Sequence, residues 1–240
     1  MYMDYTYLIY VMPAILLSMI AQAMVKSRFA SYNRVLSKKS ITGAQAAALL
    51  LRANNIMDVK IAHISGSLTD NYNPGTKVLN LSDSTYSSTS IAAIGVAAHE
   101  TGHAIQHKVG YGPLVLRSML VPVANIGSRF GPMLAILGII FASVAQAESF
   151  IPICQLITDI GLLMFGGSVL FYLVTLPVEF NASRRAMKIL KDTGTLDSSE
   201  LNGVKKVLWA AAMTYVASAL TAIGSLMRLL VITGRKNNRR

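Results

Sequence analysis

The chain has 240 residues, of which 53% are apolar, and its 22 Lys and Arg residues against 11 Asp and Glu give a net charge of +11. An apolar fraction this high, gathered in long runs, excludes an ordinary soluble domain and favours helices that span a membrane. The single cysteine, Cys154, excludes an internal disulfide and a cysteine-rich zinc site. The basic residues lie mostly beside the apolar runs and lack interleaved aromatic residues. Their charge therefore favours contact with a lipid bilayer and argues against nucleic-acid binding.

The first apolar run, Tyr7 to Val25, is long enough to cross the hydrocarbon core. Asp4 precedes it, and basic residues follow it at Lys26, Arg28, Arg34, Lys38 and Lys39. A cleaved signal peptide carries its positive charge before the apolar run, so residues 1–28 are predicted to be a retained transmembrane anchor. The charge asymmetry places the N-terminus outside the cell and the next segment in the cytosol.

Residues 29–129 are predicted to form a polar cytosolic domain with a small β-hairpin or sheet. Thr42 to Gln45 has the spacing of a helix N-cap box, which opens an alanine- and leucine-rich helix. Val59 to Ile64 and Lys77 to Leu81 have the composition of strands, and the turn cluster Asn71 to Gly75 lies between them. The sequence therefore predicts that these two strands pair as a hairpin.

A second helix of this domain is predicted over residues 91–107, with a cap in Ser87 to Ser90 and an end at Gly110, Gly112 and Pro113. It holds His99-Glu100-Thr101-Gly102-His103, which fits the His-Glu-x-x-His pattern. Two histidines four residues apart lie on one helix face and can bind the same zinc ion, while Glu100 is placed to act on the zinc-bound water. The alternative is a pair of structural histidines that are satisfied by hydrogen bonds in the core.

The two other histidines are not predicted to bind this ion. His107 continues the same helix face, but eight residues of helix rise about 12 Å, so it cannot share one ion with His99. We expect it to lie at the helix end or beside a ligand, or to be a plain surface residue. His63, in the first predicted strand, is expected to be structural.

Residues 130–176 contain two further apolar runs, Phe130 to Ala147 and Ile153 to Leu176, and are predicted to form a transmembrane hairpin. The link between the runs holds Glu148 and no Lys or Arg, so it is expected outside the cell. The chain then returns to the cytosol, where residues 177–206 are predicted to form a helix and a loop that carry a third metal ligand.

The last segment, residues 207–240, consists of an apolar helix over Val207 to Met227 and a basic tail. If this helix spans the membrane, the tail lies outside, which contradicts the tendency of basic residues to stay in the cytosol. The sequence leaves open whether the helix spans the membrane, is re-entrant or packs on the cytosolic domain.

A catalytic zinc site has three protein ligands and one open position, so a third ligand is needed beside His99 and His103. Glu148 is expected across the membrane, and Glu200 is typical of an acid at a helix start. Glu179 remains, because it follows the point where the chain returns to the compartment of the histidines and it opens a predicted helix. The alternative for Glu179 is an interfacial carboxylate beside a membrane span.

Four stretches of the sequence are distinctive: Leu68-Thr69-Asp70, the segment from Ala92 to Glu100 with His103, Leu116-Arg117-Ser118, and Leu176-Pro177-Val178-Glu179-Phe180-Asn181-Ala182-Ser183-Arg184-Arg185-Ala186. On these residues the chain resembles the neutral zinc metallopeptidases of bacterial membranes (the YugP-like family) along nearly its whole length. More distantly it is similar to the heat-shock membrane peptidases and the prenyl-protein endopeptidases. Those proteins also place a membrane hairpin between the His-Glu-x-x-His helix and a Glu-x-x-Ala-Asp motif.

The resemblance implies a mainly α-helical integral membrane protein, with a helical transmembrane bundle and a zincin-like cytosolic domain. It also implies one catalytic Zn²⁺ bound by His99, His103 and Glu179, the ligand set of a gluzincin, and a catalytic base at Glu100. The expected activity is that of a membrane-bound zinc endopeptidase.

One residue departs from the wider pattern, because the aspartate of the Glu-x-x-Ala-Asp motif is Ser183 here. In the wider group that aspartate is expected to orient a ligand histidine. Asn181, Ser183 or another group has to take this role.

These features predict a multi-pass protein of the bacterial cell (inner) membrane with its active site on the cytosolic side. The expected partners are the lipid bilayer and a peptide or protein substrate, unfolded or membrane-associated, held as an added strand along Lys77 to Leu81. A second donor to the developing oxyanion is needed. The sequence does not choose among Tyr72, Tyr86, Asn181, Arg184 and Tyr215.

Two other classes of protein compete with this interpretation. A catalytically inactive zinc-binding membrane scaffold or chaperone is disfavoured by the intact Glu100, although Ser183 leaves it open. A transporter or channel would place paired polar residues within its spans. The spans here carry little beyond Asp159 and Gln155, which argues against transport.

Overall fold

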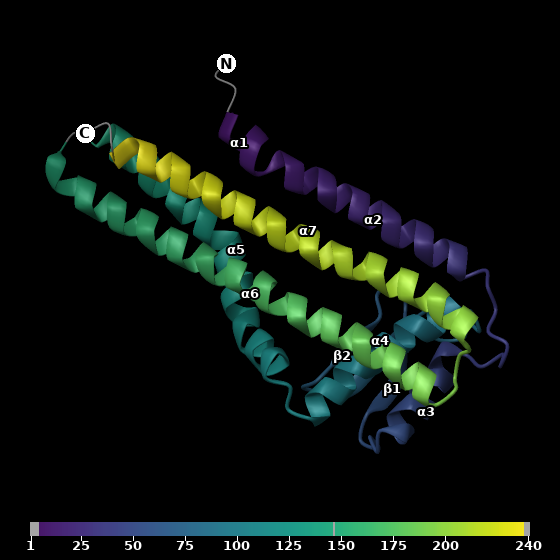
Figure 1. Ribbon diagram of the computed structural model, residues 1–240. Helices are drawn as coiled ribbons and strands as arrows, with labels where there is room; N and C mark the ends of the chain where they lie inside the picture. The colour runs from purple at the N-terminus through teal and green to yellow at the C-terminus, as the bar shows by residue number, and fades with distance from the viewer. Residues whose placement is uncertain (1–4, 146, 238–240) are drawn as a thin grey trace. The chain divides into compact units, whose positions relative to one another are not determined.

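The computed structural model describes residues 5–145 and 147–237, most of them helical (Figure 1). Residues 1–4, which begin the predicted anchor, and 238–240, which end the predicted basic tail, lie outside the described residues. The chain divides into two compact units. The helix unit comprises residues 1–20, 116–175 and 215–240, and the mixed unit comprises residues 21–115 and 176–214.

The helix unit contains the whole of α1 (Tyr5–Tyr10) and parts of four longer helices. These are α2 (Met12–Tyr32), α5 (Gly112–Val144), α6 (Ile151–Asp192) and α7 (Ser198–Asn237). The 3₁₀ helix η1 (Glu148–Phe150) precedes α6. Three stretches of the described chain are long and apolar enough to cross a membrane: Gly112–Val144, Glu148–Asp192 and Ser198–Gly234. They cover the three later apolar runs except for residues 145–147, so the prediction of a mainly α-helical fold with candidate membrane spans is confirmed.

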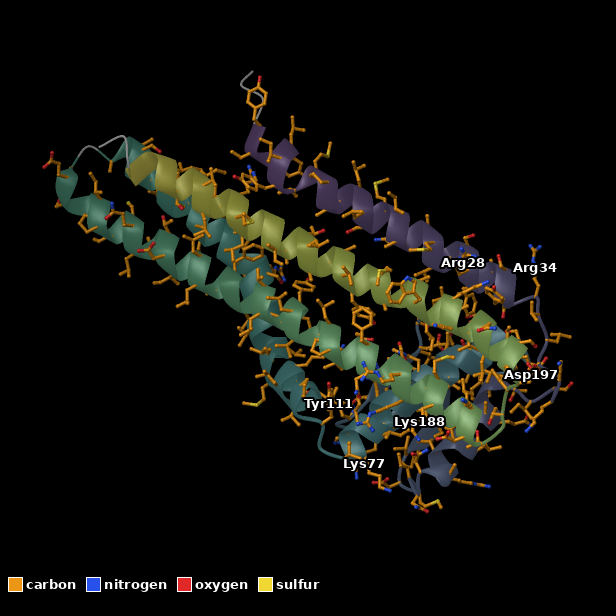
Figure 2. The ribbon with its side chains drawn as sticks, viewed as in Figure 1. Arg28, Arg34, Lys77, Tyr111, Lys188 and Asp197 are labelled. Carbon is orange, nitrogen blue, oxygen red and sulfur yellow. The ribbon has the colours of Figure 1, made fainter. Side chains whose placement is uncertain are left out.

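The first apolar run has a different form. A turn at Val11 divides it between α1 and α2, and neither helix is among the three candidate spans of the described chain. Figure 2 shows Arg28 on α2 and Arg34 just after its end, the basic flank that the sequence placed after the run. The transmembrane anchor over residues 1–28 stays a prediction.

Small residues bring α5 and α6 together in the helix unit. A Cβ atom on Gly127 would lie 2.1 Å from the carbonyl oxygen of Met164. Further along, a Cβ on Gly161 would lie 2.4 Å from the backbone nitrogen of Ala135. Membrane helices gain little from hydrophobic attraction for one another, so close backbone approach at small residues is how such helices associate.

The C-terminal part of α7 lies beside the end of α5 and the start of α6. One cavity of the helix unit is lined by Ala142 of α5, by Gln155 and Asp159 of α6, and by Leu230 and Thr233 of α7. Helix α7 is also continuous from end to end. Three alternatives for the fourth apolar run stay predictions: that it spans the membrane, is re-entrant or packs on the cytosolic domain.

The helix caps predicted for the mixed unit are confirmed. Thr42 caps α3 (Gly43–Ala53) in a complete capping box with Gln45, and Ser90 caps α4 (Ile91–Lys108) by accepting a hydrogen bond from a backbone N–H. After α4 ends, Gly110 has a φ of +61°. This left-handed conformation favours glycine, which has no Cβ to clash.

The predicted hairpin is wrong. Strand β1 (Lys60–Ile64) pairs in parallel with β3 (Val78–Ser82), and β2 (Asn71–Asn73), in the segment expected to be a turn, pairs antiparallel with β3. A parallel pair needs a crossover of about a dozen residues, which residues 65–77 provide. The sheet order is β1-β3-β2. Because β3 is the central strand, the prediction that it offers a free edge to a substrate is also wrong.

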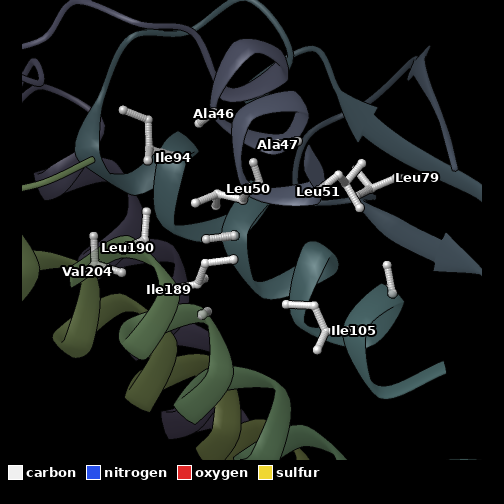
Figure 3. Close-up of a cluster of buried hydrophobic side chains, with 14 of the residues drawn as sticks. Ala46, Ala47, Leu50, Leu51, Leu79, Ile94, Ile105, Ile189, Leu190 and Val204 are labelled. Carbon is white, nitrogen blue, oxygen red and sulfur yellow. The ribbon is translucent and has the colours of Figure 1, made fainter. Parts of the chain in front are cut away.

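A large apolar core holds much of the mixed unit together. Figure 3 shows side chains from α3, β3, α4, α6 and α7 meeting there, among them Leu50, Leu79, Ile94, Ile105, Leu190 and Val204. Burying one such side chain stabilises the fold by about 1.5–3 kcal/mol. The core therefore fixes α4 against α3, the sheet and the C-terminal part of α6.

Helix α6 continues through Pro177, where the sequence predicted a new helix. Proline lacks an N–H and tends to kink or end a helix, yet α6 runs unbroken from Ile151 to Asp192. Glu179 therefore lies inside a long helix, and the prediction that it opens one is wrong. A helix interior restricts the position of its side chain more than a helix start would.

We expect Gly127→Ala to destabilise the helix unit, because its added methyl group meets the backbone of Met164. Overpacking of this kind costs about 1–3 kcal/mol. The matched control is Gly166→Ala on α6, where an added Cβ has no neighbour within 4 Å. Alanine favours helix over glycine, so this control should unfold at the wild-type temperature or slightly above it. Thermal unfolding in detergent tests the pair, and equal unfolding temperatures would contradict the close approach.

Candidate metal centre

Helix α4 presents two histidines on one face. Ser90 fixes its first turn, and the alanine-rich sequence that follows packs against the core on the opposite side. His99 and His103 lie one turn apart, with ring centroids separated by 4.8 Å and ring planes at 86°. The two imidazoles therefore converge on one point, as the four-residue spacing predicts.

Glu179 joins the two histidines from α6. Its Oε2 lies 3.2 Å from Nε2 of His99 and 3.6 Å from Nε2 of His103. The carboxylate is almost completely buried, with 1% of the residue exposed. One ligand atom from each of the three residues lies within 4.8 Å of the other two. All three belong to the mixed unit, so the sequence correctly predicted that they meet.

The distances from Glu179 to the two imidazoles fit a shared zinc ion. Ligands at about 2.0–2.2 Å from a tetrahedral zinc lie about 3.3–3.5 Å from one another. The two distances from Glu179 to the imidazole nitrogens, 3.2 and 3.6 Å, bracket that separation. Two imidazoles and one carboxylate also form a ligand set typical of catalytic zinc, which keeps a fourth position for water. No ion is part of the structure, and the fit rests on the donor atoms alone.

A glycine lets α4 and α6 come this close. A Cβ atom on Gly102 would lie 2.6 Å from the carbonyl oxygen of Ala182. Gly102 stands between the two histidines, and Ala182 stands one turn after Glu179. The backbones of the two helices are therefore almost in contact at the level of the three donor groups. A side chain at Gly102 would push Glu179 away from the imidazoles.

Each histidine has a hydrogen-bond partner on the nitrogen that points away from Glu179. Nδ1 of His99 lies 3.1 Å from the hydroxyl of Ser183, and Nδ1 of His103 lies 3.0 Å from Oε1 of Gln106. Ser183 thus makes the kind of contact to a histidine that is expected of the aspartate at this position. Asn181, the other candidate for that role, bonds to Gln106 instead. Such partners orient the imidazole and fix which nitrogen is free for a metal.

The sequence interpretation missed Gln106. Its position three residues after His103 places it on the same helix face. That spacing was the available signal, but an amide side chain near a histidine is common and does not indicate a contact. The partners of the Gln106 oxygen and nitrogen become clear only when α6 is packed against α4.

Glu100 is buried beside the two histidines, with 8% of the residue exposed. Burial raises the pKa of its carboxyl to about 7, while the nearby His99 and a hydrogen bond from the backbone of Tyr72 oppose this rise. A carboxylate whose pKa lies near neutrality can both accept and release a proton. Because Tyr72 is the central residue of β2, the backbone of that strand lies beside Glu100.

The two remaining histidines contact side chains outside the proposed ligand set. His107 does not join the cluster of three donors, and its Nδ1 lies 2.8 Å from the hydroxyl of Tyr72. His63 pairs with Asp83 at 2.7 Å and packs edge-on against Tyr86. Neither histidine belongs to the group of three donors found among the described residues, and their exclusion as ligands stays a prediction.

The two glutamates rejected as third ligands lie elsewhere. Glu148 is in η1 of the helix unit. Glu200 is in the first turn of α7, where it accepts hydrogen bonds from the backbone N–H groups of Lys38 and Asp197. The prediction that Glu200 acts at a helix start is therefore confirmed.

The structure gives each candidate oxyanion donor a different environment but does not single out one of them. The Tyr72 hydroxyl is engaged with His107, and Tyr86 lies against His63. Asn181 uses its carbonyl oxygen to accept from Gln106 and Arg185, and Tyr215 belongs to the helix unit. The side chain of Arg184 is exposed. Tyr72 is the candidate whose backbone touches the carboxylate of Glu100.

Comparisons with known proteins agree with this geometry. A family model described as "Putative neutral zinc metallopeptidase" matches residues 7–234. The chain is 42% identical to the "Putative membrane protease YugP" of Bacillus subtilis (strain 168) over 224 residues, which cover 92% of this chain and 95% of that relative. No solved structure matches the chain.

We expect Glu179→Ala to lose tightly bound zinc, because it removes one of three donor groups that converge within 4.8 Å. The affinity should fall by more than about 100-fold, the upper end of what loss of a ligand's hydrogen-bond partner costs. Metal analysis and a competing chromophoric chelator measure this in purified protein. Glu148→Ala, which removes an exposed carboxylate in η1, is the control and should keep wild-type zinc. Full zinc in Glu179→Ala would remove that residue from the ligand set.

Proposed function

The chain belongs to this family of neutral zinc metallopeptidases, and from that premise we propose that it is a membrane-bound zinc endopeptidase. His99, His103 and Glu179 bind the zinc ion, and Glu100 is the general base. The observation that carries the proposal is that donor atoms of two histidines and Glu179 converge, with the buried carboxylate of Glu100 next to them.

The metal and Glu100 would have different tasks in catalysis. When bound, zinc supplies a Lewis acid that polarises the scissile carbonyl and lowers the pKa of a water molecule toward neutrality. Glu100 accepts a proton from the attacking water and delivers it to the leaving amine. Its raised pKa supports this role, since the group must bind and release a proton in one turnover. Ser183 and Gln106 hold the two imidazoles in place from behind.

The substrate is a peptide in an extended conformation. β2 is an edge strand of the sheet, and the backbone of its central residue, Tyr72, bonds to Glu100. An extended segment that pairs with this edge by strand addition would present its backbone next to the general base. Recognition through the backbone favours unfolded or flexible proteins, including those associated with the membrane, over folded ones.

We expect Glu100→Gln to keep zinc and lose hydrolysis. Glutamine preserves the size of the side chain but cannot accept the proton, and loss of a general base lowers kcat by about 10²–10⁴-fold. The measurement is cleavage of an unfolded protein by purified enzyme in detergent, blocked by a chelator and restored by zinc. Glu148→Gln should cleave as wild type does.

Two results would contradict the proposal in different ways. Full activity of Glu100→Gln with bound zinc would remove Glu100 from the mechanism. Wild-type protein that binds zinc and cleaves nothing would instead favour a catalytically inactive zinc-binding scaffold or chaperone.

We propose that the chain crosses the bacterial cell membrane several times, with the zinc site on the cytosolic side. Three long apolar helices support the crossings. The basic residues that follow α2, and the absence of Lys and Arg between α5 and α6, support the orientation.

Cysteine labelling tests this orientation in a Cys154→Ala background, which has no other cysteine. Ser67 lies in the mixed unit, Ser149 lies in η1, and both are exposed. In intact cells a membrane-impermeant maleimide should label Ser149→Cys and leave Ser67→Cys unlabelled until the cells are lysed. Labelling of Ser67→Cys before lysis would place the zinc site outside the cell.

A further inference from the structure

Gln106 connects the histidine helix to the helix that carries Glu179. Its side chain is completely buried, at 0% exposure. Oε1 lies 3.0 Å from Nδ1 of His103. Nε2 donates to the backbone carbonyl of Val178 at 2.8 Å and to the side-chain carbonyl of Asn181 at 3.0 Å. One amide thus contacts a proposed ligand on α4 and the residues on both sides of the other proposed ligand, Glu179, on α6.

The chemistry of its neighbours allows only one orientation of this amide. The carbonyl oxygen of Val178 can only accept a hydrogen bond, so the NH₂ end of Gln106 must face α6. Asn181 is also fixed, because its Oδ1 accepts a 2.7 Å hydrogen bond from Nε of Arg185, and a guanidinium can only donate. The oxygen end of Gln106 must therefore face His103.

This orientation sets the tautomer of His103. An amide oxygen can only accept, so Nδ1 of His103 must carry the proton. Nε2, which faces Glu179, then has a free lone pair, the form that binds a metal. Ser183 cannot impose the same choice on His99, because a hydroxyl both donates and accepts.

We propose that Gln106 is a positioning residue of the zinc site, which fixes the metal-binding tautomer of His103 and holds it in register with Glu179. Arg185 and Asn181 support Gln106, because Arg185 fixes the side chain of Asn181 and Asn181 in turn orients the amide of Gln106. The inference rests on the proposed function, since it requires that His103 and Glu179 bind zinc.

Gln106→Met tests the proposal with a side chain of similar length that neither accepts from His103 nor donates to α6. We expect its zinc affinity to fall by about 10–100-fold, the range seen when the hydrogen-bond partner of a ligand is removed. The dissociation constant is measured with a chromophoric chelator in detergent. The unfolding temperature is measured with and without zinc, and the zinc-induced rise should shrink.

A matched control distinguishes positioning of the zinc ligands by Gln106 from a purely structural role of this residue. Ile189→Val shortens a buried side chain of α6 within the same unit and should cost about 0.5–1.5 kcal/mol of stability. It does not touch the proposed ligands, so its dissociation constant for zinc should equal that of the wild type even though the metal-free protein unfolds earlier. If Gln106→Met behaves like Ile189→Val, the residue only packs the two helices.

Variants of Asn181 keep the test decisive if Gln106→Met does not fold. Asn181→Asp retains an oxygen for Gln106 and Arg185 and should bind zinc within about threefold of the wild type. Asn181→Leu removes that oxygen and should weaken zinc binding by about tenfold, the lower end of the same range. Wild-type affinity in Gln106→Met, or in Asn181→Leu where only that variant folds, would overturn this inference alone. Failure of the wild-type protein to bind zinc would overturn the proposed function as well.

Discussion

The site depends on the near contact of two helix backbones, α4 at Gly102 and α6 at Ala182. A Cβ at Gly102 would lie 2.6 Å from the carbonyl oxygen of Ala182. This approach brings His99 and Glu179, 80 residues apart in the sequence, to 3.2 Å. Two donor atoms must lie about 3.3–3.5 Å apart to share a tetrahedral zinc. A separation of the helices by even one methyl group would exceed what side-chain adjustment of a buried glutamate can recover, because protein interiors are closely packed.

The placement of Glu179 in the middle of a helix also keeps its carboxylate at a fixed distance from the imidazoles. A ligand on a loop would need further contacts to hold its position, whereas a side chain inside a continuous helix is restricted by the backbone on both sides. Val178 and Asn181, its neighbours on α6, both bond to Gln106, so the turn that presents the carboxylate is itself tied to α4. The carboxylate, the two imidazoles and the amide behind them form one hydrogen-bonded group across two helices.

The sequence predicted local features well and pairings between distant segments poorly. The His99 and His103 pair and the caps at Thr42 and Ser90 depend on neighbours within one turn of helix, so their spacing is sufficient to predict them. The sheet was wrong because β1 and β3 are joined by a crossover, and strand composition does not specify the partner or its direction. Glu179 was predicted by eliminating other acids and by resemblance. Gln106 was missed because the direction of its amide is set by α6, not by α4.

Buried charge explains why the site and a divalent cation belong together. Glu100 and Glu179 are both less than 10% exposed, and burial of carboxylates is costly unless cations or hydrogen bonds compensate. An imidazole that binds a metal through a lone pair adds no charge, so a divalent cation would supply the positive charge that buried Glu179 and Glu100 lack. The free energy of metal binding then adds to the free energy of folding. The apolar core formed by Leu50, Ile94 and Leu190 holds α4 and α6 together apart from this effect, so the helices can form the donor set before the ion binds.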